Sequence, residues 1–447
     1  MKVLRWALAV ATVLAAAAAL VAWLNVRGEV DETADETAGE TAGETADVAD
    51  RTTDHSHTAS LIQRGAYLAL AGNCMPCHTE RGGRPYAGGR GIETPFGTVL
   101  SSNLTPDTAT GIGRWTRADF WRALHHGRSR DGRLLYPVFP YPNYTQVTRG
   151  DADAILAYLR SLPAVSQVNK PHALRFPYNS QAALAVWRAL FFKAAVFEPD
   201  SQQSAAWNRG AYLVRGLGHC EACHAPRNSL GATTGSVELS GGLVAQQRWY
   251  APSLAASQEA GVADWGTQDI VALLKTGQSP RTTGLVTVMG PMAEVVFRST
   301  QHLADADLQA IATFLQQLPQ VPTMPTVPAT AQAAADPATL ARGATVYADH
   351  CSSCHGEQGQ GGGTAYPSYP PLAGNRAVVM ASSANVVRVV LVGGYLPATA
   401  GNPQPYGMPP FGPLLSDAQI ADVATYIRQS WGHSATPVSQ LDVLRSR

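Results

Sequence analysis

The segments 74–78, 220–224 and 351–355 read CMPCH, CEACH and CSSCH, and they hold all six cysteines of the 447-residue chain. Cys-x-x-Cys-His is the attachment signature of c-type haem, in which two thiols add to the vinyl groups of one porphyrin. The adjacent histidine reaches the iron as its first axial ligand. The sequence therefore predicts three covalently bound c-type haems, at Cys74, Cys77, His78, Cys220, Cys223, His224, Cys351, Cys354 and His355.

Structural disulfides and a zinc site are the alternatives for these cysteines. A zinc site would combine ligands from two pairs, and it does not require a histidine directly after each pair. The histidine that follows every pair favours haem at all three positions.

The sequence around each haem motif repeats, which indicates one module present three times. An Arg-Gly-Ala segment precedes each motif, at 64–66, 209–211 and 342–344, and a last amphipathic helix follows, at 157–163, 313–319 and 425–431. We expect the glycines of these segments to lie under Tyr158, Phe314 and Tyr426, because a missing Cβ permits close helix crossing. The alternative is that each glycine only marks a helix start.

This plan predicts a mostly α-helical protein with three tandem class I cytochrome c domains after an N-terminal membrane helix. The last helix of the third module has a capping box of Ser416 and Gln419, and Asp151 and Asp305 are predicted caps of the other two. The predicted parts are an anchor (1–27), a tether (28–60), domain 1 (61–165), a linker (166–204), domain 2 (205–320), a linker (321–335), domain 3 (336–433) and a tail (434–447).

The amino terminus carries a membrane signal. Lys2 and Arg5 precede an apolar run at 6–24, close to the ~20 residues that span a bilayer. Basic residues before the run and acidic residues after it place the body outside the cytoplasm. We favour a retained anchor over a cleaved signal peptide, and expect the protein on the periplasmic side of the inner membrane.

Two further segments bear on partners. Residues 31–46 repeat DETA or GETA and predict an acidic, extended tether. The apolar stretch 185–192 is too short to span a bilayer, and it either packs on a neighbouring module or faces a membrane or partner. The formal net charge is zero and no basic run is dense enough to follow phosphates, which argues against nucleic acid as a partner.

The second axial ligand of each iron is expected from the loop before the last helix, where a methionine thioether suits an electron carrier. Met408 in YGMPPF (406–411) is that ligand in the third module. The second module offers Met289 and Met292, and Met292 is favoured because its spacing to the last helix is closer to that of Met408.

The first module departs from this pattern. Phe139 occupies the expected position, and phenylalanine cannot bind iron. The remaining possibilities are His126 or His125, the more distant His172, or a site with no protein ligand.

The chain resembles the membrane-bound tri-haem cytochrome c subunits of bacterial periplasmic dehydrogenases, such as the alcohol and gluconate dehydrogenase complexes. The resemblance rests on NLTPDTATGIGRWTRADFWRAL (103–124), LYPVFPYPNYT (135–145), GPMAEVV (290–296), YPPLAGN (369–375) and GMPPFGPLLSDAQIADVATYIRQSWG (407–432). It supports Met292 and Met408 as ligands. Alcohol dehydrogenase relatives tend to carry methionine at the position of Phe139. A phenylalanine at this position resembles relatives that are associated with molybdenum hydroxylases.

The resemblance implies an electron-transfer subunit. A separate catalytic subunit of PQQ, flavin or molybdenum type would oxidise the substrate, and ubiquinone or a terminal oxidase would take the electrons. The chain itself shows no nucleotide-binding fingerprint and no nucleophile–base set, so no catalytic residue is assigned. The alternatives are a self-sufficient multihaem enzyme with an open first haem, and a cytochrome subunit of a terminal oxidase.

Overall fold

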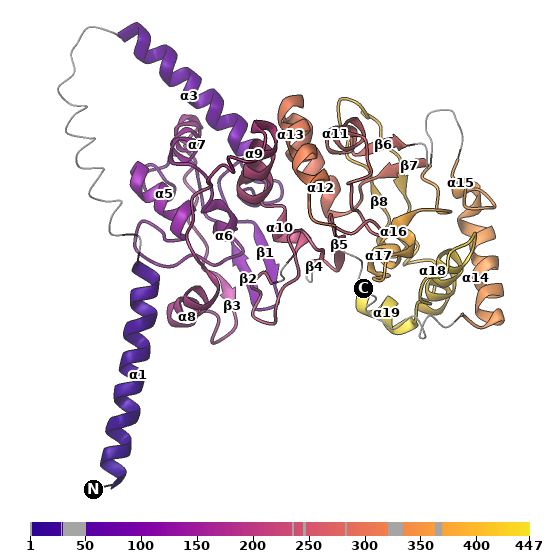
Figure 1. Cartoon of the computed structure of the whole chain (residues 1–447), viewed down its shortest axis with the longest axis horizontal. Helices are drawn as coiled ribbons and strands as arrows, with labels where there is room; N and C mark the ends of the chain where they lie inside the picture. The colour runs from indigo at the N-terminus through magenta and orange to yellow at the C-terminus, as the bar shows by residue number, and fades with distance from the viewer. Residues whose placement is uncertain are drawn as a thin grey trace. The chain divides into compact units, whose positions relative to one another are not determined.

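The computed structural model describes residues 2–27, 29, 51–234, 237–244, 247–281, 284–320, 334–362 and 369–447. These residues form mainly helices, with short antiparallel sheets (Figure 1). The chain divides into two compact units, residues 1–198 with 215–219, and residues 199–214 with 220–447. The predicted tether repeat at 31–46 and most of the predicted linker 321–335 lie outside the described residues.

The first unit contains one set of helices around the first haem motif and a small sheet. Its elements are α1 (Lys2–Val26), α3 (Arg51–Ala71), α4 (Cys74–Cys77), β1 (Gly91–Thr94), β2 (Gly97–Leu100), α5 (Arg117–His126), α6 (Tyr141–Tyr144), α7 (Arg149–Ser161), β3 (Ala173–Leu174) and α8 (Gln181–Phe191). The sheet order is β1-β2-β3, and β3 pairs with β2 through Gly97 and Leu174. The segment 166–204 thus contributes both β3 and α8 to this unit.

The second unit contains the other two haem motifs. Around the second motif lie α9 (Ala205–Tyr212), the π-helix η1 (Leu213–Leu217), α10 (Glu221–His224), β4 (Gly242–Val244), β5 (Trp249–Ala251), α11 (Thr267–Thr276), β6 (Gln278–Arg281), β7 (Gly284–Thr287), α12 (Pro291–Arg298), the short 3-10 helix η2 (Thr300–His302) and α13 (Asp305–Gln316). Around the third lie α14 (Pro337–His350), α15 (Ser352–His355), α16 (Arg376–Val379), α17 (Ala384–Val392), β8 (Gly394–Tyr395), β9 (Gly407–Met408), α18 (Asp417–Gln429) and α19 (Gln440–Ser446).

Each haem motif is preceded by a helix that crosses the last helix of its module at a glycine. A Cβ at Gly65, Gly210 or Gly343 would collide with a backbone carbonyl oxygen of the partner helix, at Ala154, Ala310 or Asp422. The same Cβ would lie 2.9, 2.8 and 2.7 Å from the Cβ atoms of Tyr158, Phe314 and Tyr426, respectively. The expected crossing under these three aromatic residues is therefore confirmed.

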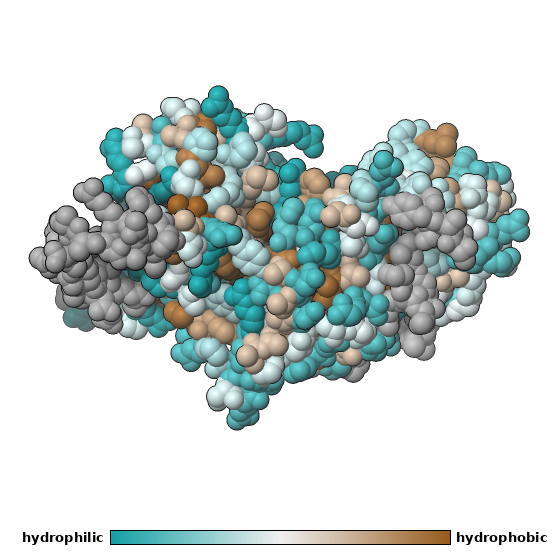
Figure 2. Space-filling view, turned by 90° about the horizontal axis from the view of Figure 1, so that it is seen from above, coloured by the Kyte–Doolittle hydropathy of each residue, from teal (hydrophilic) through white to brown (hydrophobic). Residues whose placement is uncertain are grey.

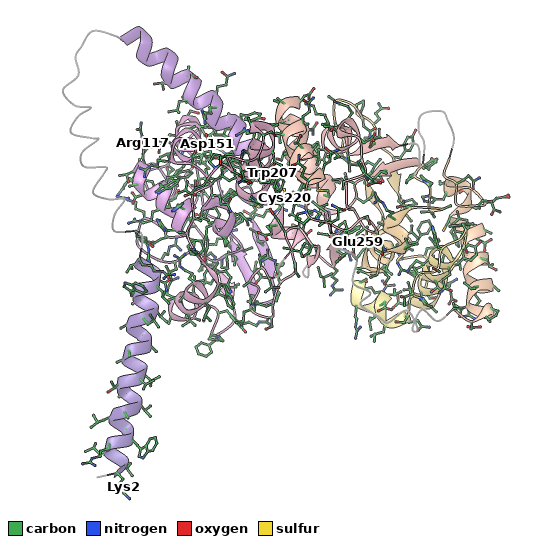
Figure 3. All side chains as sticks on the ribbon, viewed as in Figure 1. Lys2, Arg117, Asp151, Trp207, Cys220 and Glu259 are labelled. Atoms are coloured by element: carbon green, nitrogen blue, oxygen red, sulfur yellow. The ribbon has the colours of Figure 1, made fainter. Side chains whose placement is uncertain are left out.

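An arginine beside each glycine adds an ion pair to the crossing. Arg64 pairs with Asp151, Arg209 with Asp307 and Arg342 with Asp422. Asp151 lies on α7 at this contact, as Figure 3 shows. The three pairs have the same role. In the first two modules the carboxylate lies three residues before the one that faces the glycine, whereas in the third module Asp422 is itself that residue.

The helix caps match the expectation in one module and differ in two. Ser416 and Gln419 form the predicted capping box of α18. Thr148 caps α7 by accepting from the backbone N–H of Asp151, so the prediction of Asp151 as the cap is wrong. Ala304 occupies the cap position of α13 without a side-chain bond, and the prediction of Asp305 is also wrong. Asp151 points instead at Arg64, because an ion pair satisfies its buried carboxylate.

The N-terminal helix α1 is long and apolar enough to cross a membrane, by length and composition. Its side chains are exposed over almost the whole length, and Asn25 near the C-terminal end is the one that is buried. The expected apolar N-terminal helix is therefore present.

Candidate haem-binding sites

Each Cys-x-x-Cys-His motif includes a short helical turn, at Cys74–Cys77, Glu221–His224 and Ser352–His355. The backbone N–H of each histidine donates to the carbonyl of the first cysteine, at 3.2 Å for His78, 2.9 Å for His224 and 3.0 Å for His355. Each histidine carbonyl accepts from a glycine N–H at 2.8 Å, from Gly88, Gly241 and Gly361 in turn. Figure 3 shows the second of these turns at Cys220.

Those glycines need a left-handed backbone, with φ of 78° at Gly88, 87° at Gly241 and 79° at Gly361. A side chain is strained in that region, so the residue type is set by the turn itself. The loop reverses behind the histidine and passes beside its ring.

The loop that returns past each histidine fixes the direction of the imidazole ring. Nδ1 of His78 donates to the carbonyl of Ser102 at 2.8 Å, Nδ1 of His224 to that of Pro252 at 2.7 Å, and Nδ1 of His355 to that of Pro370 at 3.0 Å. A carbonyl only accepts, so Nδ1 carries the hydrogen and the lone pair lies on Nε2. This is the tautomer that an iron-binding histidine requires.

Burial favours the form of histidine that binds iron. It lowers the pKa of His78, His224 and His355, because desolvation penalises the imidazolium ion. The neutral ring with a free Nε2 is therefore the stable state at neutral pH.

The cysteines fit thioether attachment better than the alternatives. All six are free thiols in the structure, so none forms a disulfide. Burial raises the pKa of Cys74 and Cys220 to about 12 and that of Cys351 to about 11, because desolvation penalises the thiolate. Among the described residues, no three His, Cys, Asp or Glu side chains come together as a metal site.

Glu259 is a positioning residue that the sequence did not single out. It is buried, at 6% exposure, and accepts from the backbone N–H of Ser253 at 2.7 Å and from the Tyr250 hydroxyl at 3.0 Å (Figure 3). Ser253 follows Pro252, whose carbonyl orients His224. The carboxylate of Glu259 thus fixes the loop whose Pro252 carbonyl orients the His224 ring. A single acidic residue in a loop gave no signal by sequence pattern alone.

The predicted methionine ligands lie in the segments that precede the last helices of their modules, Met292 in a helix and Met408 in a short strand. Met408 forms β9, pairs with Gly394 of β8, and is half-buried against the core of the third module. Met292 occupies the first turn of α12 after Pro291. The terminal methyl of Met289 would lie 3.0 Å from a Cβ at Gly394, so this methionine contacts the third module. That contact adds to the spacing argument for Met292.

The expected ligand position of the first module is lined by aromatic rings. Phe139 lies 5.4 Å from Tyr144 between ring centroids, and the Tyr144 hydroxyl donates to the carbonyl of Gly72. Gly72 lies just ahead of the first haem motif, separated from it by Asn73. The sequence position at which the first module lacks a methionine therefore carries a ring that belongs to an aromatic cluster.

The three histidines proposed as replacements occupy different surroundings. His125 stacks on Trp121 at 4.5 Å, and both His125 and His126 are buried, at 4% exposure. Nδ1 of His172 accepts from the backbone N–H of Leu100, so its other ring nitrogen carries the hydrogen and has no lone pair for iron. This arrangement removes His172 from the candidates.

A fourth histidine near the first site was missed. His219 is partly buried, its Nδ1 donates to the carbonyl of Leu217 at 2.9 Å, and its ring lies 5.5 Å from Tyr144. It follows the π-helix Leu213–Leu217, and such helices occur often at functional sites. Its position directly before Cys220 was the one sequence feature that could have drawn attention to it. Nothing in the sequence showed that it packs beside Tyr144.

The helix crossings, the oriented histidines and the cysteine pairs define a c-type cytochrome. A cytochrome c family model matches residues 62–163 and 340–431. The chain is 40% identical to the cytochrome c subunit of a quinone alcohol dehydrogenase from Gluconacetobacter polyoxogenes, covering 87% of this chain and 84% of that protein. It is 37% identical to the gluconate 2-dehydrogenase cytochrome c subunit of Pantoea cypripedii, covering 86% and 88%.

The chain therefore belongs to the family of cytochrome c subunits of dehydrogenases. A further similarity, at 35% identity, is to the fructose dehydrogenase cytochrome subunit of Gluconobacter japonicus, covering 85% of this chain and 81% of that protein.

Proposed function

We propose that the chain is the electron-transfer subunit of a membrane-bound dehydrogenase complex and that it carries three c-type haems. The main observation in support is that the same histidine geometry occurs three times. In each case Nδ1 donates to a loop carbonyl, so that Nε2 keeps the lone pair that can bind iron. When bound, c-type haem supplies a one-electron iron couple, and the protein contributes ligands, spacing and a low dielectric. A separate subunit oxidises the substrate, and ubiquinone or a terminal oxidase accepts the electrons.

The middle module carries a haem on the same grounds as the outer two. The family model does not extend over it. However, His224 makes the same three bonds as His78 and His355, to Cys220, to Gly241 and to Pro252. Gly210 also allows the same helix crossing.

The number of haems is directly measurable. We expect three haems per chain by the pyridine haemochrome assay, all retained after acid–acetone extraction because they are thioether-linked. Replacing both Cys220 and Cys223 with serine should lower the count to two, with the outer sites intact. A wild-type count of two that does not change in this variant would show that the middle module binds no haem.

The first haem is proposed to lack a methionine ligand, because Phe139 fills that position. We expect Phe139→Met to add one methionine–iron charge-transfer band in the near-infrared spectrum of the oxidised protein, and to raise the first potential, since thioether favours ferrous iron. Phe139→Leu is the size-matched control and should add no band. An unchanged spectrum in Phe139→Met would mean that this loop does not face the iron.

A self-sufficient enzyme with an open first haem is the second candidate, and the aromatic cluster around Phe139 is what favours it. Carbon monoxide should bind the reduced wild-type protein at one haem if the site is open. Turnover of peroxide or nitrite by the purified chain alone would support this candidate, and inactivity without a partner would exclude it.

The N-terminal helix α1 is proposed to remain attached as a membrane anchor, with the body on the periplasmic side. Asn25 near its C-terminal end donates to the carbonyl of Ala185 at 2.9 Å and accepts from Arg188 at 2.9 Å. Removal of this helix would take both of these contacts away from the folded body. Amino-terminal sequencing of the mature protein tests this, and a first residue after position 27 would contradict it.

Two routes distinguish the proposed function from its alternatives. Affinity purification of the tagged full-length chain from its own membranes should recover a catalytic dehydrogenase subunit. Recovery of copper–haem oxidase subunits instead would support a role in a terminal oxidase. The cofactor of the recovered subunit would identify the partner as PQQ, flavin or molybdenum type.

A further inference from the structure

Helix α8 has its polarity reversed relative to a helix on a water-facing surface. Its sequence, QAALAVWRALF, contains one charged residue, Arg188, and that residue is buried, at 3% exposure. The outward side carries Val186 at 46%, Leu190 at 66% and Phe191 at 39% exposure. We call these three residues the apolar face of α8. A surface helix normally presents charge to water and apolar side chains to the core.

The reversal is held by a polar cluster in which Arg188 is fully engaged. Its guanidinium donates to the side chain of Asn25 and to the carbonyl of His126, and it lies over the rings of Tyr141 and Phe192. The inward position of the charge is therefore specific. Rotation of α8 to bring Arg188 to the surface would break each of these contacts.

The same cluster joins α8 to the end of the N-terminal helix. Arg128 donates to the carboxylate of Glu29 at 2.9 Å and to the backbone carbonyl of Asn25 at 2.9 Å. Asn25 is the first polar residue after the end of the apolar run, and α8 lies beside that point (Figure 1). The boundary between the lipid-compatible part of α1 and its polar end is at the level of α8.

We propose that the apolar face of α8 is a membrane-docking surface that lies in the interfacial layer of the same bilayer that α1 crosses. The proposal rests on α1 being the retained anchor described above. Because α1 leaves the bilayer at Asn25, the helix packed against Asn25 is placed at the lipid headgroups. An apolar helix face is stable there and costly in water.

The surroundings of α8 favour lipid over a protein partner as the occupant. Phe176, in the loop before the helix, is 84% exposed, and the exposed cations Arg175, Lys193 and Arg27 flank α8 and the end of α1. Aromatic and basic side chains around an apolar face are typical of a headgroup-level segment. Figure 2 shows hydrophilic and hydrophobic residues intermixed on the face that is seen from above.

The test uses the full-length wild-type protein in proteoliposomes of phosphatidylethanolamine and phosphatidylglycerol, with no partner subunit. A carbene photolabel that partitions into the lipid phase is activated, and labelled residues are located by mass spectrometry. We expect label on α1 and on Val186, Leu190 and Phe191 of α8. Leu414 and Tyr395, exposed at 65% and 74% in the other unit, are the matched apolar controls and should stay unlabelled.

A variant confirms that the label reports the apolar face. In the combined variant Val186→Ser, Leu190→Ser and Phe191→Ser, label on α8 should be lost while label on α1 and the haem content stay unchanged. All three side chains are exposed and none of them belongs to the buried core.

The outcomes separate this proposal from the one it rests on. Label on α1 with none on α8 would overturn the docking surface alone. A mature chain without α1 would contradict the anchor. Label on α8 that disappears when the purified catalytic subunit is added would show that the face binds protein instead of lipid.

Discussion

Replacement of Gly65 with alanine is expected to prevent the first module from closing around its haem. A Cβ at this position would occupy the place of the Ala154 carbonyl oxygen and lie 2.9 Å from the Cβ of Tyr158. Neither the backbone of α7 nor a Cβ atom can move aside as a flexible side-chain tip could. The helices must separate, which would cost about 3 kcal/mol or more of the free energy of unfolding.

The measurement is haem content together with denaturant unfolding of the purified protein. We expect the haem count to fall by one, or the first module to unfold at a clearly lower denaturant concentration. Gly150→Ala in α7 is the matched control, because nothing lies within 4 Å of a Cβ there. Alanine at that exposed helical position should stabilise the protein by about 0.5–1 kcal/mol. Equal effects of the two substitutions would contradict the close crossing.

The second large effect is expected from Met408→Ala. Loss of the thioether should remove one methionine–iron charge-transfer band and lower the third haem's potential on the order of 0.2 V, a part of the ~0.8 V range that axial ligands cover. Electron delivery to the acceptor should slow, because this haem would no longer lie at the potential that the relay requires. Redox titration followed by near-infrared absorption measures both changes.

Met380→Leu is the control for Met408→Ala within the same module. Met380 is buried, at 5% exposure, and we expect it to fill the core only. Its replacement should leave the spectrum and all potentials unchanged. In the second module, Met292→Leu should remove a band and Met289→Leu should not. A band that persists in Met408→Ala would show that another side chain binds the third iron.

Local patterns predicted the features that depend on short spacing. Each haem motif is a contiguous run of residues, and the crossings at Gly65, Gly210 and Gly343 followed from aligning three copies of one module. The capping box joins Ser416 to Gln419 within the first turn of one helix, and it was predicted correctly.

Contacts between segments that are distant along the chain could not be predicted from the sequence. Arg64 and Asp151 are 87 residues apart, and their ion pair engages the carboxylate of Asp151 while Thr148 caps α7. The carbonyl that orients His224 comes from a loop that the buried carboxylate of Glu259 holds through Ser253. His219 was not noticed, because its neighbour Tyr144 comes from another module of the sequence.

The orientation of α8 was also outside the reach of periodicity. The stretch 185–192 left open whether it packs on protein or faces a membrane. Its pattern gives the helix but not which side faces outward, since Arg188 would ordinarily be assigned to the surface. The partner that draws Arg188 inward is Asn25, 163 residues away.

The most direct test of the central claim is stopped-flow absorption of the haems in the complex purified with its catalytic subunit. On mixing with the substrate of that subunit, we predict that all three haems become reduced. Addition of a ubiquinone analogue should then reoxidise them. The chain without its partner should remain oxidised in the same substrate. Haems that stay oxidised in the active complex, or a chain that is reduced by substrate alone, would contradict its role as an electron-transfer subunit.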